Sequence, residues 1–385
     1  MKITKLETLC LSRMHEPERQ WITSRYRTVK ADCAIVVIHT DEGLTGFAEA
    51  SAYGWPLLIR EWVDWLAPEL VGKDPEDLAI VPHPNGRSRT HDAAVAGIDC
   101  ALWDLRGKLA GKRVADLLAE AAGRTPLERV RIYASSGCRY DWRDRPEQLI
   151  EEALDYIEQG FTAMKFRIGT EWSWDNVTVD RFLGLVNELA REVDGRMDLM
   201  LDGNCRLTEE EATEIAFELD RLGFVFFEEP MPRDLVDAHT RLAAAVEMPI
   251  SGGEVFTTLE EFRPYIEAKA YDIVQPDAAL CGLTEAMRIA EVAYRYGLPT
   301  APHSWHNGLM AMEHAHYVAA LPNPLMLEVC QIQGPLQWAI LAERPVIEDG
   351  YLVLPDKPGL GVELAEDLKS RFPYIEGHYA IQVQR

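Results

Sequence analysis

The sequence lacks several features that mark membrane, secreted and disulfide-bonded proteins. It contains no run of about 18 apolar residues, so no transmembrane segment is expected. The N-terminal stretch MKITKLETLCLSRM carries charges where a secretory signal would be continuously apolar. The seven cysteines are dispersed without a CxxC pair, which favours buried thiols in a reducing compartment over a disulfide framework.

Basic residues are also scarce relative to acidic ones. There are 39 Lys and Arg against 63 Asp and Glu, which gives a formal charge of -24. An acidic surface repels a phosphate backbone, so nucleic-acid binding is not expected. The hydrophobic content of 47% is ordinary for a globular protein, and 385 residues can bury a large core. We therefore expect a cytoplasmic globular protein without a nucleic-acid or membrane partner.

The order of the predicted elements indicates an α+β segment followed by a barrel. Residues 1–55 are rich in strand-forming patterns, and residues 56–120 show mainly helical periodicity. Seven helix candidates then alternate with eight short apolar strands, which are VRIYASS, AMKFRIG, MDLMLDGN, FVFFEEP, PISGGE, DIVQPD, LPTAPHS and LMLEV. This alternation is typical of a parallel sheet with helices outside it, and eight strands predict closure. An open doubly wound sheet is the alternative, but no GxGxxG opens a helix here.

We therefore predict an α/β protein built on a (β/α)8-type (TIM) barrel. The N-terminal α+β capping domain is expected at residues 1–125, and the catalytic barrel at 126–345. Residues 346–385 include DGYLVLPDKPGLGVEL, which is turn-rich and too long for a barrel helix. This C-terminal return is expected to pack on the capping domain and complete it.

Polar residues recur along the predicted barrel at intervals of about one strand–helix unit. They are Asp202, Glu228, Glu254, Asp277, His303 and Glu328, with spacings of 26, 26, 23, 26 and 25 residues. All but the last stand at the downstream end of an apolar run, whereas Glu328 lies within its run. Because the strand ends of a barrel form one rim, these residues are predicted to converge on one pocket.

The first three of these residues, Asp202, Glu228 and Glu254, are all carboxylates. Any one of them alone is more simply explained as a helix cap or a solvated loop residue. Three converging carboxylates repel one another unless a cation lies between them. Oxygen ligands without Cys or His favour a hard ion, so Mg2+ is predicted, with Mn2+ as an alternative. The neighbouring Glu229 should point away from the metal along the strand.

The next two residues, Asp277 and His303, are predicted to form a hydrogen-bonded dyad. An isolated histidine is usually structural, but this one ends a strand one unit after the aspartate. The aspartate would fix the imidazole tautomer and stabilise its charged form. His303 is therefore a candidate general base or acid, and His306 a weaker one or a substrate contact.

Lys165 and Arg167 are two residues apart on one predicted strand, so both can point into the barrel mouth. A lysine there can act as a base if its pKa is lowered, whereas an arginine stays charged and anchors carboxylates. Glu328, if protonated, could donate a hydrogen bond to a developing enolate oxygen. Asn204 lies two residues after Asp202 and could reach a ligand.

The ordered set of motifs resembles the enolase superfamily, in particular its mandelate racemase-like branch, which includes acid-sugar dehydratases. HDAAVAGIDCALWDLRGKLAGKRVADLL resembles the N-terminal domain helix of that family, and PDKPGLGVEL its C-terminal return. The barrel motifs AMKFRIG, LDGN, FEEP, SGGE, QPDAALCGLTEA, APHSWHNG and LMLEV appear in the family's order. The resemblance covers most of the chain.

By position, the resemblance implies a role for each of these residues. Asp202, Glu228 and Glu254 correspond to the metal ligands, Asp277 and His303 to the dyad, Glu328 to the enolate contact and Asn204 to a polar substrate contact. Lys165 corresponds to the first lysine of a KxK pair, and Arg167 departs from the second. In the family, two loops of the capping domain set specificity. Here they are expected near residues 15–30, with Trp21, Arg25 and Tyr26, and near residues 50–57, with Tyr53 and Trp55.

The function that this resemblance implies is Mg2+-dependent dehydration of a sugar acid, an aldonate or an aldarate, to a 2-keto-3-deoxy acid. His303 or Lys165 would remove the proton α to the carboxylate. The alternative is a racemase or epimerase, which needs bases on both faces of the substrate and is disfavoured by Arg167. A non-catalytic binder should lack part of the metal and dyad set, and the ordered motifs argue against an unrelated metal-dependent aldolase. We expect a small-molecule carboxylate substrate and a homo-oligomer.

Overall fold

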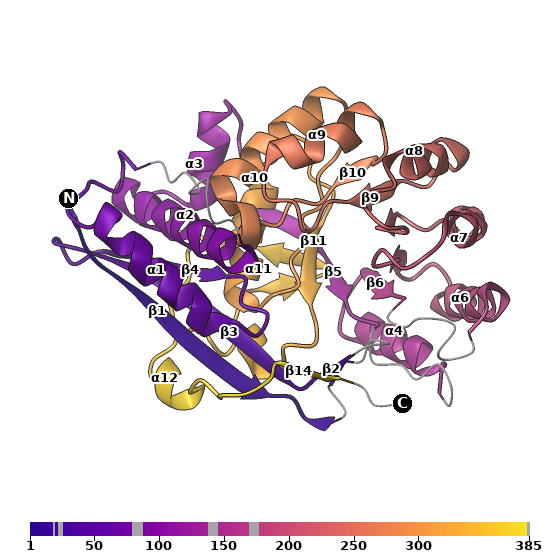
Figure 1. Ribbon diagram of the computed structural model, residues 1–385, viewed down its shortest axis with the longest axis horizontal. Coiled ribbons are helices and arrows are strands. Elements are labelled where there is room, and N and C mark those ends of the chain that lie inside the picture. Colours follow the sequence, from indigo (N-terminus) through magenta and orange to yellow (C-terminus); the bar gives the residue numbers. More distant parts are fainter. Residues whose placement is uncertain (18–19, 22–25, 79–87, 138–144, 169–176, 383–385) are drawn as a thin grey trace.

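The computed structural model describes residues 1–17, 20–21, 26–78, 88–137, 145–168 and 177–382. Its N-terminal part is a three-stranded antiparallel sheet in the order β1 (Ile3–Met14), β3 (Lys30–Thr40), β4 (Thr45–Ala50). The β-branched run of β3 is buried along almost its whole length. Helices α1 (Pro56–Leu70) and α2 (Arg89–Ala110) cover one face of this sheet (Figure 1), and α3 (Val114–Ala121) follows them.

The second part is a closed barrel of parallel strands. Its strands are β5 (Arg129–Ser135), β6 (Ala163–Arg167), β7 (Asp198–Asp202), β8 (Phe227–Glu228), β9 (Ile250–Gly252), β10 (Ile273–Val274) and β11 (Leu327–Cys330). Consecutive strands pair from β5 to β10, and β11 pairs in parallel with β5. The predicted strand LPTAPHS contributes one residue, Thr300, which bridges Val274 on one side and Pro324 on the other. This bridge closes the ring at the position of the seventh expected strand, between β10 and β11.

Helices surround the barrel on the outside (Figure 1). They are α4 (Gln148–Glu158), α6 (Val179–Val193), α7 (Glu209–Leu222), α8 (Val236–Ala245), α9 (Leu259–Glu267), α10 (Ala278–Arg295) and α11 (Gly308–Ala320). Each of α4, α6 and α7 buries one apolar stripe against the strands, as helical periodicity predicts. In α6, for example, Phe182, Val186, Leu189 and Val193 are all buried.

The C-terminal return connects the two parts. After the short 3-10 helix Gly334–Gln337, the chain forms β12 (Ile347–Glu348) and β13 (Tyr351–Val353). Strand β13 pairs antiparallel with β5, and β12 pairs antiparallel with β13. The chain then passes α12 (Leu368–Arg371) and ends in β14 (Ala380–Gln382), which pairs with β2 (Tyr26–Thr28). Lys30 donates a hydrogen bond of 2.7 Å to the Ile375 carbonyl, so the return is fixed to the N-terminal sheet.

This architecture confirms the predicted barrel, its N-terminal cap and a C-terminal return that completes the cap. The exact domain boundaries, after residues 125 and 345, stay a prediction. The cytoplasmic location and the homo-oligomeric state also stay predictions. Within the described residues, no helix has the length and apolar character needed to cross a bilayer. The six cysteines in that part of the chain are free thiols.

Candidate active site

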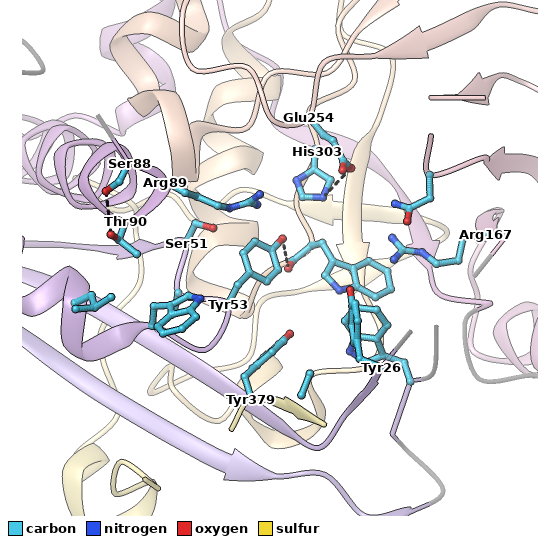
Figure 2. A pocket seen from close by; sticks show the side chains of 17 residues that line it. Tyr26, Ser51, Tyr53, Ser88, Arg89, Thr90, Arg167, Glu254, His303 and Tyr379 are labelled. Carbon is cyan, nitrogen blue, oxygen red and sulfur yellow. Dashed lines mark hydrogen bonds and ion pairs between the residues drawn. The ribbon is translucent and has the colours of Figure 1, made fainter. Parts of the chain in front are cut away.

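A cavity of about 590 Å³ lies where the cap meets the rim of the barrel. The rim contributes Arg167, Asn204, Glu254, His303 and Trp305. The cap and the C-terminal return contribute Trp21, Tyr26, Ser51, Ala52, Tyr53, Trp55, Leu58, Ser88, Arg89, Thr90, Tyr379 and Ala380. Figure 2 shows that these side chains come from opposite walls and face a common space. The volume is in the range that small-molecule sites occupy.

The Asp277–His303 pair lies at the inner end of this cavity. Asp277 stands just before α10, where its Oδ1 accepts a hydrogen bond from the Ala279 amide at 2.9 Å. Its Oδ2 accepts from His303 Nδ1 and from His306 Nε2, both at 2.8 Å. Burial acts to raise the pKa of Asp277, but the two imidazoles outweigh it and hold this pKa well below its usual range. The aspartate is therefore ionised, and Nε2 of His303 is the ring nitrogen left for chemistry.

His303 is itself surrounded by negative charge. Its Nε2 lies 3.4 Å from an oxygen of Glu254 (Figure 2). Burial favours the neutral imidazole, but Glu254, Glu328 and Asp277 together raise the pKa of His303 to about 10. A cation held by Glu254 would neutralise part of that charge and bring the pKa back toward neutrality.

Glu254 follows β9 and is held from behind by an arginine. Arg233 contacts Glu254 at 3.2 Å and also pairs with Glu229. Glu229 is buried and is not part of the cavity lining. Arg233 therefore fixes the orientation of Glu254 without entering the cavity lining.

Lys165 lies beneath the cavity rather than in its wall. Its Nζ donates to both oxygens of Glu228, at 2.8 and 2.7 Å, and lies 3.0 Å from Glu328. Burial favours the neutral amine, but these carboxylates outweigh it and raise the pKa of Lys165 well above its ordinary value. The structure thus differs from the expectation of a lysine with a lowered pKa, because here the nearest groups to Lys165 are anions.

Glu328 is fully buried on β11 and is held in its ionised form. Its oxygens accept hydrogen bonds of 2.5 Å from Ser135 Oγ and from the Ser304 amide. Burial acts to raise its pKa, but Lys165, His303 and these donors lower the pKa of Glu328 to about 2. This arrangement disfavours the protonated form expected of Glu328, because two hydrogen-bond donors and Lys165 lie against its oxygens.

Arg167 enters the cavity with its flat face covered by aromatic rings. Its Cζ lies 4.4 Å from the Trp305 ring centroid and 5.7 Å from that of Trp21. One guanidinium nitrogen lies 3.3 Å from Asp202 Oδ2. Stacking of this kind orients the plane of a guanidinium group, which is suited to pairing with carboxylates.

Of the three predicted metal ligands, Asp202 and Glu228 are buried at the ends of the paired strands β7 and β8, and Glu254, which follows β9, is partly exposed. Asp202 pairs in register with Glu228, and burial together with Glu254 and other neighbours raises the pKa of both. For Glu228 the pKa reaches about 8. Within the described residues, Asp202 Oδ2 accepts no hydrogen bond, and its ion-pair partner is the Arg167 nitrogen 3.3 Å away. An excess of buried carboxylates with an oxygen unsatisfied is a donor set that fits a hard cation.

A second group of possible ligand atoms is closer together. Among the described residues, Asp277, His303 and His306 place one ligand atom each within 4.8 Å of the others. Both imidazoles already direct a nitrogen at one aspartate oxygen, which is the geometry of two donated hydrogen bonds. We therefore interpret this group as the dyad, and a cation site at Asp202, Glu228 and Glu254 stays a prediction.

The predicted residues that the structure describes occupy two positions relative to the cavity. Trp21, Tyr26, Tyr53, Trp55, Arg167, Asn204, Glu254 and His303 line it. Lys165, Asp202, Glu228, Asp277, Glu328 and His306 are buried and are not in its lining. The ring of His306 lies 5.1 Å from that of Tyr53, and its Nε2 contacts Asp277. His306 therefore packs against a lining residue without lining the cavity itself. Arg25 lies outside the described residues.

Several lining residues were not anticipated from the sequence. Trp305 could have been predicted to line the cavity, because it lies only two residues after His303. Arg89, Ser51 and Tyr379 come from the start of α2, the end of β4 and the C-terminal return. No motif in the sequence marks these three, because their place in the site depends on how the cap docks.

Comparison with known proteins identifies the class. Residues 148–368 match the enolase C-terminal domain-like family, and residues 7–119 match the mandelate racemase / muconate lactonizing enzyme N-terminal domain. The chain belongs to this family of the enolase superfamily.

Named relatives match over most of their length. An arabinonate dehydratase of Saccharolobus solfataricus is 32% identical over 86% of this chain and 87% of that protein. A D-galactarolactone cycloisomerase of Agrobacterium fabrum is 28% identical over 97% and 99%. Among solved structures, the 3,6-anhydro-D-galactonate cycloisomerase of Zobellia galactanivorans is 28% identical with a TM-score of 0.81, covering 97% of this chain and 99% of its own. An enolase superfamily member from Polaromonas sp. JS666 is 30% identical with a TM-score of 0.84, covering 98% and 99%.

Proposed function

We propose that this protein is a Mg2+-dependent dehydratase that converts a sugar acid, an aldonate or an aldarate, into a 2-keto-3-deoxy acid. The observation that carries the proposal is the oriented dyad, in which His303 directs Nε2 into the cavity while Nδ1 is fixed by Asp277. Relatives named as dehydratases of arabinonate and of D-galactonate support the substrate class.

The reaction begins with removal of the proton α to the substrate carboxylate. His303 Nε2 is the base, because it lines the cavity and its tautomer is fixed by Asp277. Lys165 is the weaker candidate, since it is paired with two carboxylates and does not line the cavity. The imidazolium that forms can then donate its proton to the departing β-hydroxyl, so one residue performs both transfers.

The charge that develops during this step needs stabilisation. Asp202, Glu228 and Glu254 would hold Mg2+, which when bound would neutralise the enolate that forms as the α-proton leaves. Arg167 binds the substrate carboxylate through its guanidinium group, whose plane is oriented by stacking on Trp305. The aromatic and cap residues of the cavity exclude water around the reacting atoms.

An isomerase is the second candidate. Two relatives that match nearly the whole chain are named cycloisomerases. A racemase would need a second base, and Arg167 and the ion-paired Lys165 are both poorly suited to that role. Product mass separates these alternatives, because dehydration loses one water whereas isomerisation conserves mass.

The proposal is tested by incubating the protein with Mg2+ and a panel of aldonates, aldarates and their lactones. A product that has lost one water and behaves as a 2-keto-3-deoxy acid supports the dehydratase. A product of unchanged mass formed from a lactone or an epimer supports the isomerase. The His303→Asn protein, checked for unchanged circular dichroism, is the control for background conversion.

A further inference from the structure

The cavity contains a second guanidinium group that the proposed reaction does not use. Arg89 is the first residue of α2 and lines the cavity together with Arg167. In Figure 2 the two guanidinium groups reach in from opposite sides, and His303 lies between them. Arg89 is therefore placed to meet the part of a substrate that is remote from Arg167.

Arg89 is oriented in the same way as Arg167. Its Cζ lies 4.9 Å from the centroid of the Tyr53 ring, so an aromatic ring covers one face of the guanidinium. Tyr53 is itself fixed, because its hydroxyl donates a hydrogen bond of 3.1 Å to the Trp305 carbonyl. The N–H edge of Arg89 remains available, and such an edge matches a carboxylate with two parallel hydrogen bonds.

Among the described residues, no acidic side chain forms an ion pair with Arg89. Arg167, by contrast, lies 3.3 Å from Asp202. Ser88 and Thr90, which flank it, also line the cavity and offer hydroxyl groups. A ligand that brings its own anion to this end of the cavity would complete these interactions.

We propose that Arg89 binds a second carboxylate at the far end of the sugar chain, so that the substrate is a dicarboxylic sugar acid, an aldarate. An aldonate would present a neutral hydroxymethyl group there, which leaves the cation without a partner. This inference rests on the proposed function, because it assumes that the first carboxylate lies at the reacting end beside Arg167 and His303.

The test uses pairs of substrates that differ only at the terminal carbon. Each aldarate is compared with the aldonate of the same configuration, and the ratio of their kcat/KM values is measured for the wild-type protein and for Arg89→Leu. We expect the wild type to prefer the aldarate, and Arg89→Leu to lower the ratio by about tenfold to a hundredfold, the range for a lost hydrogen-bonded charge pair. Arg89→Lys should retain part of the preference. Because the ratio is internal to each protein sample, partial unfolding does not mimic the effect.

Arg60→Leu is the matched control, since Arg60 is an exposed cap residue on α1 outside the cavity lining. It removes the same charge and should leave the ratio unchanged. A wild-type preference for aldonates, or an equal loss on both substrates in Arg89→Leu, overturns the inference. Preference for a 6-phosphoaldonate over the aldarate also overturns it, because the distal anion would then be a phosphate.

A binding measurement separates failure of this inference from failure of the proposed function. Calorimetric titration of the His303→Asn protein with the same pairs reports selectivity without turnover. If no sugar acid is dehydrated by the wild type but the aldarate binds more tightly through Arg89, the proposed function fails and the inference stands. If dehydration occurs and the aldarate has no advantage in either measurement, only the inference fails.

Discussion

His303 donates a hydrogen bond from Nδ1 to Asp277 at 2.8 Å, while its other ring nitrogen lies 3.4 Å from Glu254. This relationship links a proton-transfer group on one side to a predicted metal ligand on the other. The two nitrogens of one ring thus connect residues that are 23 positions apart in the sequence.

Replacing Asp277 with Asn should impair proton transfer while preserving the fold. The amide can donate to Nδ1 and so favour the wrong tautomer of His303, for which we expect kcat to fall by about a thousandfold or more. Asn still caps α10, because a side-chain oxygen remains to accept from the Ala279 amide. Steady-state kinetics with the thermal midpoint as control tests this, and near-normal kcat would remove the aspartate from the mechanism.

Replacing Glu254 with Gln should weaken Mg2+ binding and abolish turnover. The variant keeps the shape of the side chain but removes one of three charges that would hold the cation. Mg2+ affinity by calorimetry and activity after EDTA treatment are the measurements. Glu267→Gln, on the exposed face of α9, is the control for loss of one negative charge. Full activity of the Glu254→Gln protein without metal would contradict the assignment.

Replacing Arg167 with Lys should raise KM more than it lowers kcat. Lysine keeps the charge but lacks the planar fork and the stacking on Trp305, so we expect KM to rise by about tenfold to a hundredfold. An unchanged KM would show that this side chain does not anchor the substrate.

His316 should make the protein sensitive to acid. Its Nδ1 accepts from the Ala115 amide at 3.2 Å, and its Nε2 lies 3.0 Å from the Leu360 carbonyl, so only the neutral ring satisfies both partners. Burial lowers the pKa of His316 from 6.5 to about 4. The pKa of His316 is lower in the folded than in the unfolded protein. The stability that neutral His316 contributes is therefore fully present above about pH 6.5 and is lost as the pH falls toward 4.

Protonation of His316 should lower the free energy of unfolding by about 3 kcal/mol at most, because each unit of pKa difference corresponds to about 1.36 kcal/mol. Denaturant unfolding at pH 8 and pH 5 measures it. His316→Gln retains a donor and an acceptor but does not titrate, so it should be less stable at pH 8 and lose less stability on acidification. An identical pH dependence in both proteins would refute this role.

The barrel could be predicted from the sequence because its strands are continuous apolar runs with polar residues at their ends. Seven of the eight expected strands form ladders, and Thr300 marks the eighth. That segment, LPTAPHS, contains two prolines, which cannot donate ladder hydrogen bonds, so its pairing is limited to a single bridge.

The site could be predicted only in part. Strand ends indicated where Glu254, His303 and Arg167 would lie, since the order of strands fixes the rim. The ionisation of Glu328 and Lys165 could not be foreseen, because it depends on which buried charges become neighbours. The place of Arg89 in the site could not be predicted either, because this residue reaches the cavity only when the cap packs on the barrel.

The most direct test of the account is to incubate the protein in D2O with Mg2+ and a sugar acid that it consumes. The account predicts a 2-keto-3-deoxy acid carrying solvent deuterium at C3, together with unreacted substrate of unchanged configuration. Accumulation of the α-epimer, without any keto acid, would contradict the dehydratase and favour a racemase.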